Sequence, residues 1–247
     1  MSEKDNLTKY RLEQNHNLVE LEKKWGRYCY VPLDIPKFEN QEIVDWFFKK
    51  CAPSKKIKAD IAASDYNDTL FNAVDVFVQE PLGGDYHIWE INPQQDFFQL
   101  FPEFFKTIQK EFPFEFIGRI IFWSSINDVP PHRDQLEFLD FPHSFRIILH
   151  DENPNQTLSL IEHLPDTPDD FTNEFSIPKL EETNSFAWNN LRVKHTSKFI
   201  PGHRKIIILL IGQVNKDRYN NLMERSVQKF DQYAFKSNLT LDNWVKI

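Results

Sequence analysis

Two side chains that commonly bind metals stand two residues apart in the segment Pro130-Pro131-His132-Arg133-Asp134. The prolines hold the backbone extended, because each fixes its own φ and restricts the residue before it. Residues i and i+2 of an extended segment point to the same face, so His132 and Asp134 direct an imidazole and a carboxylate at one point. Such a pair is two-thirds of the facial triad that holds divalent iron, and it needs a second histidine.

His195 is the histidine that we expect to complete the triad. It follows Trp188 and a loop, and it precedes the most apolar strand-like segment of the chain, Lys205–Ile211. This position predicts that His195 lies at the mouth of a barrel strand. Because the third ligand should come from a strand across the barrel, a long separation in sequence from His132 and Asp134 is expected. His132 and Asp134 alone fit a hydrogen-bonded pair in a loop equally well, and it is the combination with His195 that favours a metal site.

Two arginines are candidates for binding an anionic cosubstrate. Arg204 follows His195 after a short loop, and we expect it to begin the adjacent antiparallel strand with its side chain facing the metal. A guanidinium there binds a carboxylate through two parallel hydrogen bonds. Lys205 remains an alternative, because a shift of one residue in a strand turns the next side chain inward. Arg146 lies in the apolar strand Ser144–His150, where a charge is costly unless it is paired; a carboxylate ligand and an ion pair at the barrel rim both fit.

The second half of the chain consists of short strand-like segments joined by loops, with no long helix between them. This pattern is typical of an all-β barrel or sandwich. The segments are Phe116–Trp123, Ser144–His150, Leu158–Glu162, Phe175–Ile177, Ser185–Trp188 and Lys205–Ile211. Other strands are expected at Tyr28–Leu33, Leu70–Val78 and Tyr86–Ile91, and helices after Asn40, at Phe97–Phe112 and at Asp217–Lys236.

These elements predict one compact domain, mainly β with flanking helices. Residues 1–113 form helices and strands beside the core, residues 114–212 form the β core that carries every candidate site residue, and residues 213–247 form a helical extension. The 23 phenylalanines supply ample material for a hydrophobic core.

The net charge and the composition of the chain limit the classes of molecule that it is expected to bind and the compartment in which it is expected to occur. The net charge of −8 and the pI of about 5.5 argue against nucleic acid as a partner, which draws on clustered Lys and Arg. The longest apolar run, Ile206–Ile211, is too short to span a bilayer. Cys29 and Cys51 show no disulfide or metal spacing, and no apolar leader is visible, so we expect a cytoplasmic protein. The sequence leaves the oligomeric state open.

The order His132-x-Asp134, His195 and Arg204 resembles the iron- and 2-oxoglutarate-dependent dioxygenases. Their pattern is His-x-Asp, a distal His and a following basic residue on a double-stranded β-helix, a jelly-roll or cupin-like core. The segment Phe186–Gly212 and the arginine-bearing strand at Arg146 are most similar to the aspartyl/asparaginyl β-hydroxylase and proline hydroxylase branch.

The resemblance covers about residues 114–212, and it implies a cofactor and a reaction. Fe(II) would be held by His132, Asp134 and His195, and 2-oxoglutarate by Arg204 with Arg146 as a second candidate. The cosubstrate and dioxygen would be consumed with release of succinate and CO2, usually to hydroxylate a small molecule, an amino acid or a peptide side chain. Two other classes stay open: a metal-binding cupin-like module without catalysis, and a zinc-dependent hydrolase or lyase, since zinc accepts the same ligands.

Overall fold

The computed structural model describes residues 16–51, 57–58, 70–78, 97–125, 128–134, 141–153, 158–163, 174–198, 200 and 202–239. The strand expected at Tyr86–Ile91 lies outside these ranges. No helix among the described residues is long and apolar enough to cross a bilayer.

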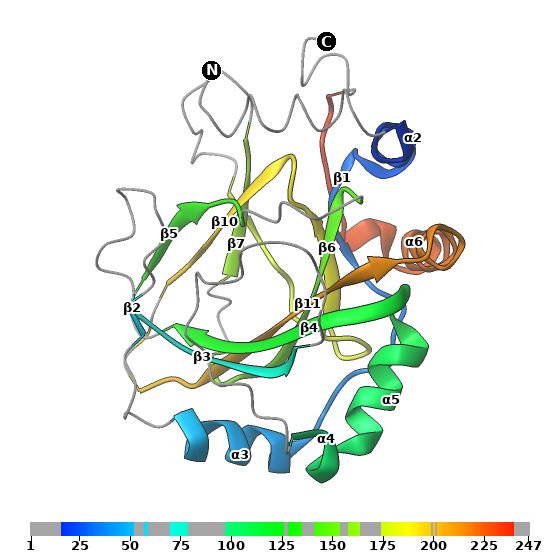
Figure 1. The fold of residues 1–247 in the computed structure, drawn as a ribbon. Coiled ribbons are helices and arrows are strands. Elements are labelled where there is room, and N and C mark those ends of the chain that lie inside the picture. The colour runs from blue at the N-terminus through cyan, green and yellow to red at the C-terminus, as the bar shows by residue number, and fades with distance from the viewer. Residues whose placement is uncertain are drawn as a thin grey trace.

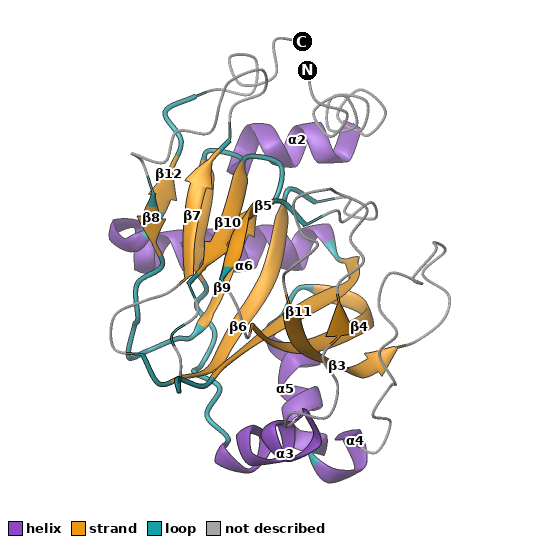
Figure 2. Ribbon diagram, turned by 90° about the vertical axis from the view of Figure 1, so that its left-hand side faces the viewer, coloured by secondary structure: helices purple, strands orange, loops and turns teal. Residues whose placement is uncertain are grey.

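The core consists of strands β4 to β11, which are divided between two facing sheets (Figures 1 and 2). Strand β4 is followed in the larger sheet by β6, β9 and β11, whereas β5, β7, β8 and β10 form the smaller sheet in the order β5-β10-β7-β8. The chain therefore crosses between the sheets at almost every step, and every strand pairing among the described residues is antiparallel. This arrangement is a double-stranded β-helix, as predicted. The bounds are β4 (Phe114–Ser125), β5 (Val129–His132), β6 (His143–Asp151), β7 (Leu158–Glu162), β8 (Phe175–Ser176), β9 (Ser185–Asn189), β10 (Val193–Ser197) and β11 (Lys205–Val214).

Strands from the flanking regions widen the larger sheet at both borders. Its full order is β12-β1-β9-β6-β11-β4-β3-β2. Strand β1 (Tyr28–Pro32) pairs with β9, and β12 (Phe235–Lys236) pairs with β1. At the other border β3 (Leu70–Val78) pairs with β4, and β2 (Ile57–Lys58) pairs with β3.

Helices α3 (Gln41–Cys51), α4 (Phe97–Leu100), α5 (Pro102–Glu111) and α6 (Lys216–Phe230) cover the face of the larger sheet that is turned away from the smaller sheet (Figures 1 and 2). Helix α2 (His16–Trp25) lies near the upper ends of the strands and contacts α6, where Nε1 of Trp25 donates to Oδ1 of Asn220 at 2.8 Å. The short 3-10 turn η2 (Asp231–Tyr233) follows α6. As predicted, the Asn40 side chain caps α3, where its Oδ1 accepts from the backbone N of Ile43 at 3.0 Å.

Two helix predictions were wrong in their bounds. The single helix expected over Phe97–Phe112 is divided at Phe101, because Pro102 has no N–H to donate to the preceding turn and begins α5 instead. The helix expected to run to Lys236 ends at Phe230, and the chain then returns to the sheet as β12.

Strand alternation divides the apolar residues of the larger sheet between two cores. Ile206 and Ile208 of β11 belong to the larger core beneath the helices, whereas Ile207 belongs to the smaller core between the two sheets. In the same way, Phe145 of β6 packs beneath the helices. Its neighbour Arg146 must therefore point into the space between the sheets, which is where the candidate site lies.

Candidate metal centre

His132, Asp134 and His195 come together between the two sheets. His132 ends β5 and lies directly opposite His195 of β10 in the antiparallel register. The Nε2 atoms of His132 and His195 lie 3.5 and 3.6 Å from Oδ1 of Asp134, and one ligand atom from each residue lies within 4.8 Å of the others. The structure thus brings together the three residues that the sequence pattern selected.

Each imidazole directs its Nε2 at Asp134. His132 Nδ1 lies 2.9 Å from the carbonyl oxygen of Pro130, and because a carbonyl only accepts, Nδ1 is the donor of this hydrogen bond. The His195 ring is buried and stacks on Trp188 at 4.6 Å with an interplanar angle of 27°. Trp188 is itself fixed, since its Nε1 donates to Oδ1 of Asn190 at 2.6 Å.

Arg146 binds the carboxylate of Asp134 on the side opposite the two imidazoles. Its Nη2 donates to Oδ2 of Asp134, while Oδ1 of the same carboxylate faces the imidazoles. The guanidinium is 1% exposed, lies 4.6 Å over the Trp188 ring, and donates through Nη1 to the carbonyl oxygen of Phe145 at 3.1 Å. Asp134 is therefore oriented, with one oxygen bound by Arg146 and one directed at the imidazoles.

Protonation in the centre suits a divalent cation. Burial favours the neutral form of Asp134, but the neighbouring His195, His132 and Arg146 outweigh it and hold the pKa of the carboxyl far below its usual range. Burial lowers the pKa of His195 well below its usual value, and His132 and Arg146 lower it further. The ionised carboxylate of Asp134 and the neutral imidazole of His195 are the forms that ligate metal ions. With Nε2 of His132, the two nitrogens and one oxygen fit the facial triad of an iron(II) site.

Arg204 does not face this centre, so its predicted orientation was wrong. It lies just before β11, and its side chain is 47% exposed. Its Nε donates to Oε1 of Glu152 at 2.8 Å, its guanidinium lies 5.1 Å over the Phe48 ring of α3, and its hydrogen bonds lower the pKa of Glu152 to about 2. Arg204 therefore belongs to the helix-covered side of the sheet.

Lys205 takes the inward position, the alternative that the sequence left open. It is 8% exposed, and its Nζ donates across the barrel to Oγ of Ser197 at 2.7 Å. Ser197 stands two residues after His195 on β10 and so shares its face. Burial lowers the pKa of Lys205 to about 8, partly offset by the carboxylate of Asp151.

The contribution of Ser197 and the stacking of Trp188 on His195 were not predicted. Ser197 carried a usable signal, because its i+2 spacing from His195 placed its hydroxyl on the same face as that candidate ligand. Trp188 carried none, since a tryptophan in an apolar strand fits ordinary core packing as well as contact with a ligand.

Comparison with known proteins gives a weak likeness. No family model matches the chain, and no curated protein matches it. The solved structure of the non-heme α-ketoglutarate-dependent epimerase SnoN from nogalamycin biosynthesis is 12% identical, covers 79% of this chain and 83% of that chain, and has a TM-score of 0.41. An oxidoreductase of the 2OG-Fe(II) oxygenase family from Burkholderia pseudomallei is 12% identical over 78% of this chain and 88% of that chain, with a TM-score of 0.39. A Pseudomonas putida prolyl-4-hydroxylase is 11% identical over 79% and 99%, with a TM-score of 0.36. Scores this low carry no argument, so fold and function rest on the strand order and on the residues of the site.

Proposed function

We propose that this protein is an oxygenase that uses iron(II) and 2-oxoglutarate. The observation that supports the proposal is the cage of His132, Asp134 and His195, with a buried cation, Lys205, on the same inner face of the barrel. Three ligands on one side of an octahedral ion leave three positions for other molecules. Bound iron(II) would supply the activation of dioxygen at these positions.

The protein's own residues would orient the reactants. His132, Asp134 and His195 would hold the ion, and Arg146 would fix the carboxylate of Asp134 by binding its second oxygen. Lys205 and Ser197 would bind the distal carboxylate of 2-oxoglutarate through charge-assisted hydrogen bonds. The cosubstrate would therefore lie along the inner face of β10 and β11. Arg146 remains a second group that a carboxylate could contact there.

The substrate class follows from the same inner face. Buried cations on the barrel interior suit a small molecule that carries a carboxylate, such as an amino acid, or an amino-acid side chain of a peptide, and hydroxylation with release of succinate and CO2 is the reaction proposed. Residues 114–212 would form the catalytic core, with residues 1–113 and 213–247 as its support. The buried free thiol of Cys29 suits the reducing cytoplasm in which we place the protein.

The triad is tested by cosubstrate turnover. Protein reconstituted with Fe(II) without oxygen, then exposed to air with 2-oxoglutarate and a panel of amino acids and peptides, should release succinate, measured by mass spectrometry. His132→Ala and His195→Ala should each abolish release. Metal analysis after anaerobic purification identifies the native ion: zinc with no succinate in any mixture would favour a hydrolase or lyase. Bound iron without turnover would favour a binding module.

The cosubstrate site is tested by two adjacent residues. Lys205→Ala should weaken 2-oxoglutarate binding about tenfold to a hundredfold, the value of losing a hydrogen bond to a charged group. Arg204→Ala should leave binding unchanged, because its guanidinium pairs with Glu152 on the other side of the sheet. Calorimetry on the anaerobic iron(II) protein measures both. Equal losses for the two variants would contradict the assignment of Lys205.

A further inference from the structure

The turn between β9 and β10, residues 189–192, has a shape that its own side chains fix. We call it the β9–β10 turn. Oδ1 of Asn189 accepts from the backbone N of Leu191 at 2.9 Å and of Arg192 at 3.2 Å, and the N of Arg192 also donates to the carbonyl oxygen of Asn189 at 3.1 Å. All three hydrogen bonds lie within the turn itself.

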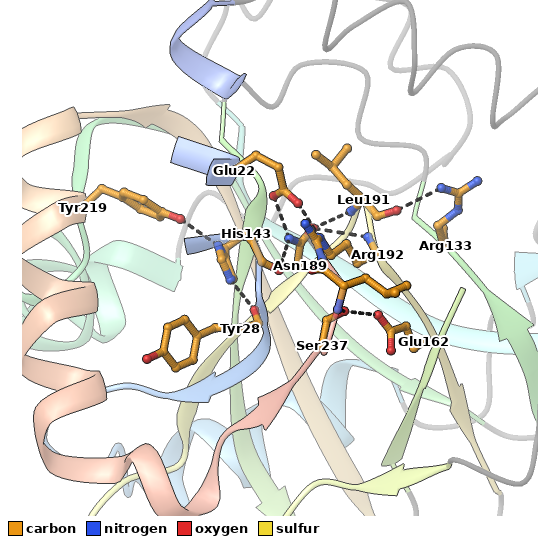
Figure 3. Close-up of polar contacts among 12 residues, drawn as sticks. Glu22, Tyr28, Arg133, His143, Glu162, Asn189, Leu191, Arg192, Tyr219 and Ser237 are labelled. Atoms are coloured by element: carbon orange, nitrogen blue, oxygen red, sulfur yellow. Dashed lines mark hydrogen bonds and ion pairs between the residues drawn. The ribbon is translucent and has the colours of Figure 1, made fainter. Parts of the chain in front are cut away.

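Helix α2 is bound to this turn through the buried carboxylate of Glu22. Glu22 is 1% exposed; its Oε1 accepts from Nε of Arg192 at 2.5 Å and its Oε2 from Nδ2 of Asn189 at 2.8 Å (Figure 3). Nη1 of Arg192 donates to the carbonyl oxygen of Leu239 at 2.8 Å. The local chain is shaped for this contact, since a Cβ on Gly26 would lie 2.2 Å from Oε1 of Glu22.

The β9–β10 turn is connected to every proposed metal ligand. Arg133, which stands between His132 and Asp134 in the sequence, donates to the carbonyl oxygen of Leu191 at 3.2 Å (Figure 3). Asn190 accepts from Nε1 of Trp188, whose ring stacks on His195. Strand β10 itself begins at Val193, directly after the turn. A displacement of the turn would therefore move both ligand-bearing strands.

The buried ion pair of Glu22 and Arg192 is better suited to fixing the position of the turn than to stabilising the fold. Removing Glu22 and Arg192 from water carries a large desolvation penalty, and burial raises the pKa of Glu22 against the lowering influence of Arg192. Well-packed apolar residues often replace such pairs without loss of stability, but they have no directional hydrogen bonds. We infer that Glu22 is a positioning residue, which holds the β9–β10 turn, and through it the three ligands, in the arrangement that binds the metal ion. The inference rests on the metal site proposed above.

The test separates positioning from stability. Glu22→Gln removes the charge, and the double variant Glu22→Leu/Arg192→Met replaces the pair by apolar side chains of similar length. Glu20→Gln is the matched control, because Glu20 lies on the same helix in an exposed ion pair with Lys216 at 2.8 Å. Calorimetry with Co²⁺, which accepts the same ligands as iron(II), measures metal affinity at a temperature at which circular dichroism shows each variant folded. Thermal unfolding without metal measures stability.

We expect the substitutions to lower the affinity for Co²⁺ without a matching loss of thermal stability. Glu22→Gln and the double variant should bind Co²⁺ about tenfold to a hundredfold more weakly than the unaltered protein, the usual effect of removing a group that orients metal ligands. The double variant should match the unaltered protein in thermal stability, and Glu20→Gln should change neither readout. Unaltered affinity in the double variant overturns the inference, and this variant decides the matter if Glu22→Gln fails to fold. Absence of Co²⁺ binding by the unaltered protein would instead refute the metal site, and the inference with it.

Discussion

The two faces of the larger sheet both carry apolar residues, but they differ in their buried charges. Beneath the helices, Phe122 lies 5.3 Å from Phe97 and 5.8 Å from Phe104 between ring centroids, within a large apolar core. The face toward the smaller sheet carries the buried cations Arg146 and Lys205. Neighbouring residues in one strand therefore pack beneath the helices or face the space between the sheets according to whether their positions are odd or even.

The difference separates the larger apolar core from the proposed site. Apolar burial on the helix-covered face stabilises the fold in proportion to the area removed from water. Charged groups on the inner face oppose folding unless they are paired. Arg146 is paired with Asp134, whereas Lys205 donates to a neutral hydroxyl and its burial lowers its pKa to about 8. Substitutions on the two faces should thus have different consequences.

The largest expected effect on stability comes from the helix-covered face. Phe122→Ala should lower the free energy of unfolding by about 3–5 kcal/mol, because a fully buried ring is lost from a close-packed core. Denaturant titration measures this loss. The Co²⁺ affinity of the folded variant should remain unchanged, and a parallel loss of metal affinity would break the separation of the two faces.

A substitution on the inner face should have a smaller effect, and it should change metal affinity in place of stability. Arg146→Gln should weaken Co²⁺ binding about tenfold to a hundredfold, or about 1.4–2.7 kcal/mol, since Asp134 loses the group that orients it. Arg146→Lys should recover only part of the affinity, because an ammonium lacks the planar fork of a guanidinium. Calorimetry on both variants is the measurement. Full affinity in Arg146→Gln would show that the contact does not orient the ligand.

The smallest effect is a pH dependence of cosubstrate binding. With a pKa of about 8, Lys205 is protonated at pH 7 and loses its proton above pH 8. The affinity for 2-oxoglutarate should therefore fall above pH 8, by up to about tenfold per pH unit, as the charged form disappears. Lys205→Arg should bind with little change across this range, because arginine stays charged. A profile that is the same for lysine and arginine would exclude Lys205 as the titrating group.

The stability of the fold should respond to pH in the opposite direction to the affinity for 2-oxoglutarate. The pKa of Lys205 in the folded protein is lower than the ordinary value of about 10.4 in an unfolded chain, so the unfolded state binds more protons between pH 8 and that value. The free energy of unfolding should consequently rise with pH in this window through Lys205, while 2-oxoglutarate binding weakens.

Local sequence features predicted most of the strands and the shared face of His132 and Asp134, which two prolines set. These features depend on neighbouring residues only, so a sequence contains them directly. His195 was selected by its position before the apolar strand Lys205–Ile211, and the structure places it beside His132 and Asp134. The short strand that carries His195, Val193–Ser197, was not predicted.

Features that depend on register or on distant contacts were not predictable. Lys205, not Arg204, faces inward because the pairing of β11 with β6 fixes the register at Lys205 opposite Asp151, and a bulge follows at Ile206/Ile207. Glu22 looks like any acid of a surface helix in the sequence, and its role depends on Arg192, which is brought to it by the fold. The sequence alone contains no signal for such pairs.

The prolines before His132 have a second consequence, for the solubility of the folded chain. Strand β5 forms a border of the smaller sheet, where free backbone N–H groups would offer another molecule a strand to pair with. Pro130 and Pro131 have no N–H, and the other three borders among the described residues are the two-residue strands β2, β8 and β12. Short or proline-blocked borders protect both sheets against edge-to-edge aggregation, so the segment that orients two of the proposed ligands also helps to keep neighbouring molecules apart.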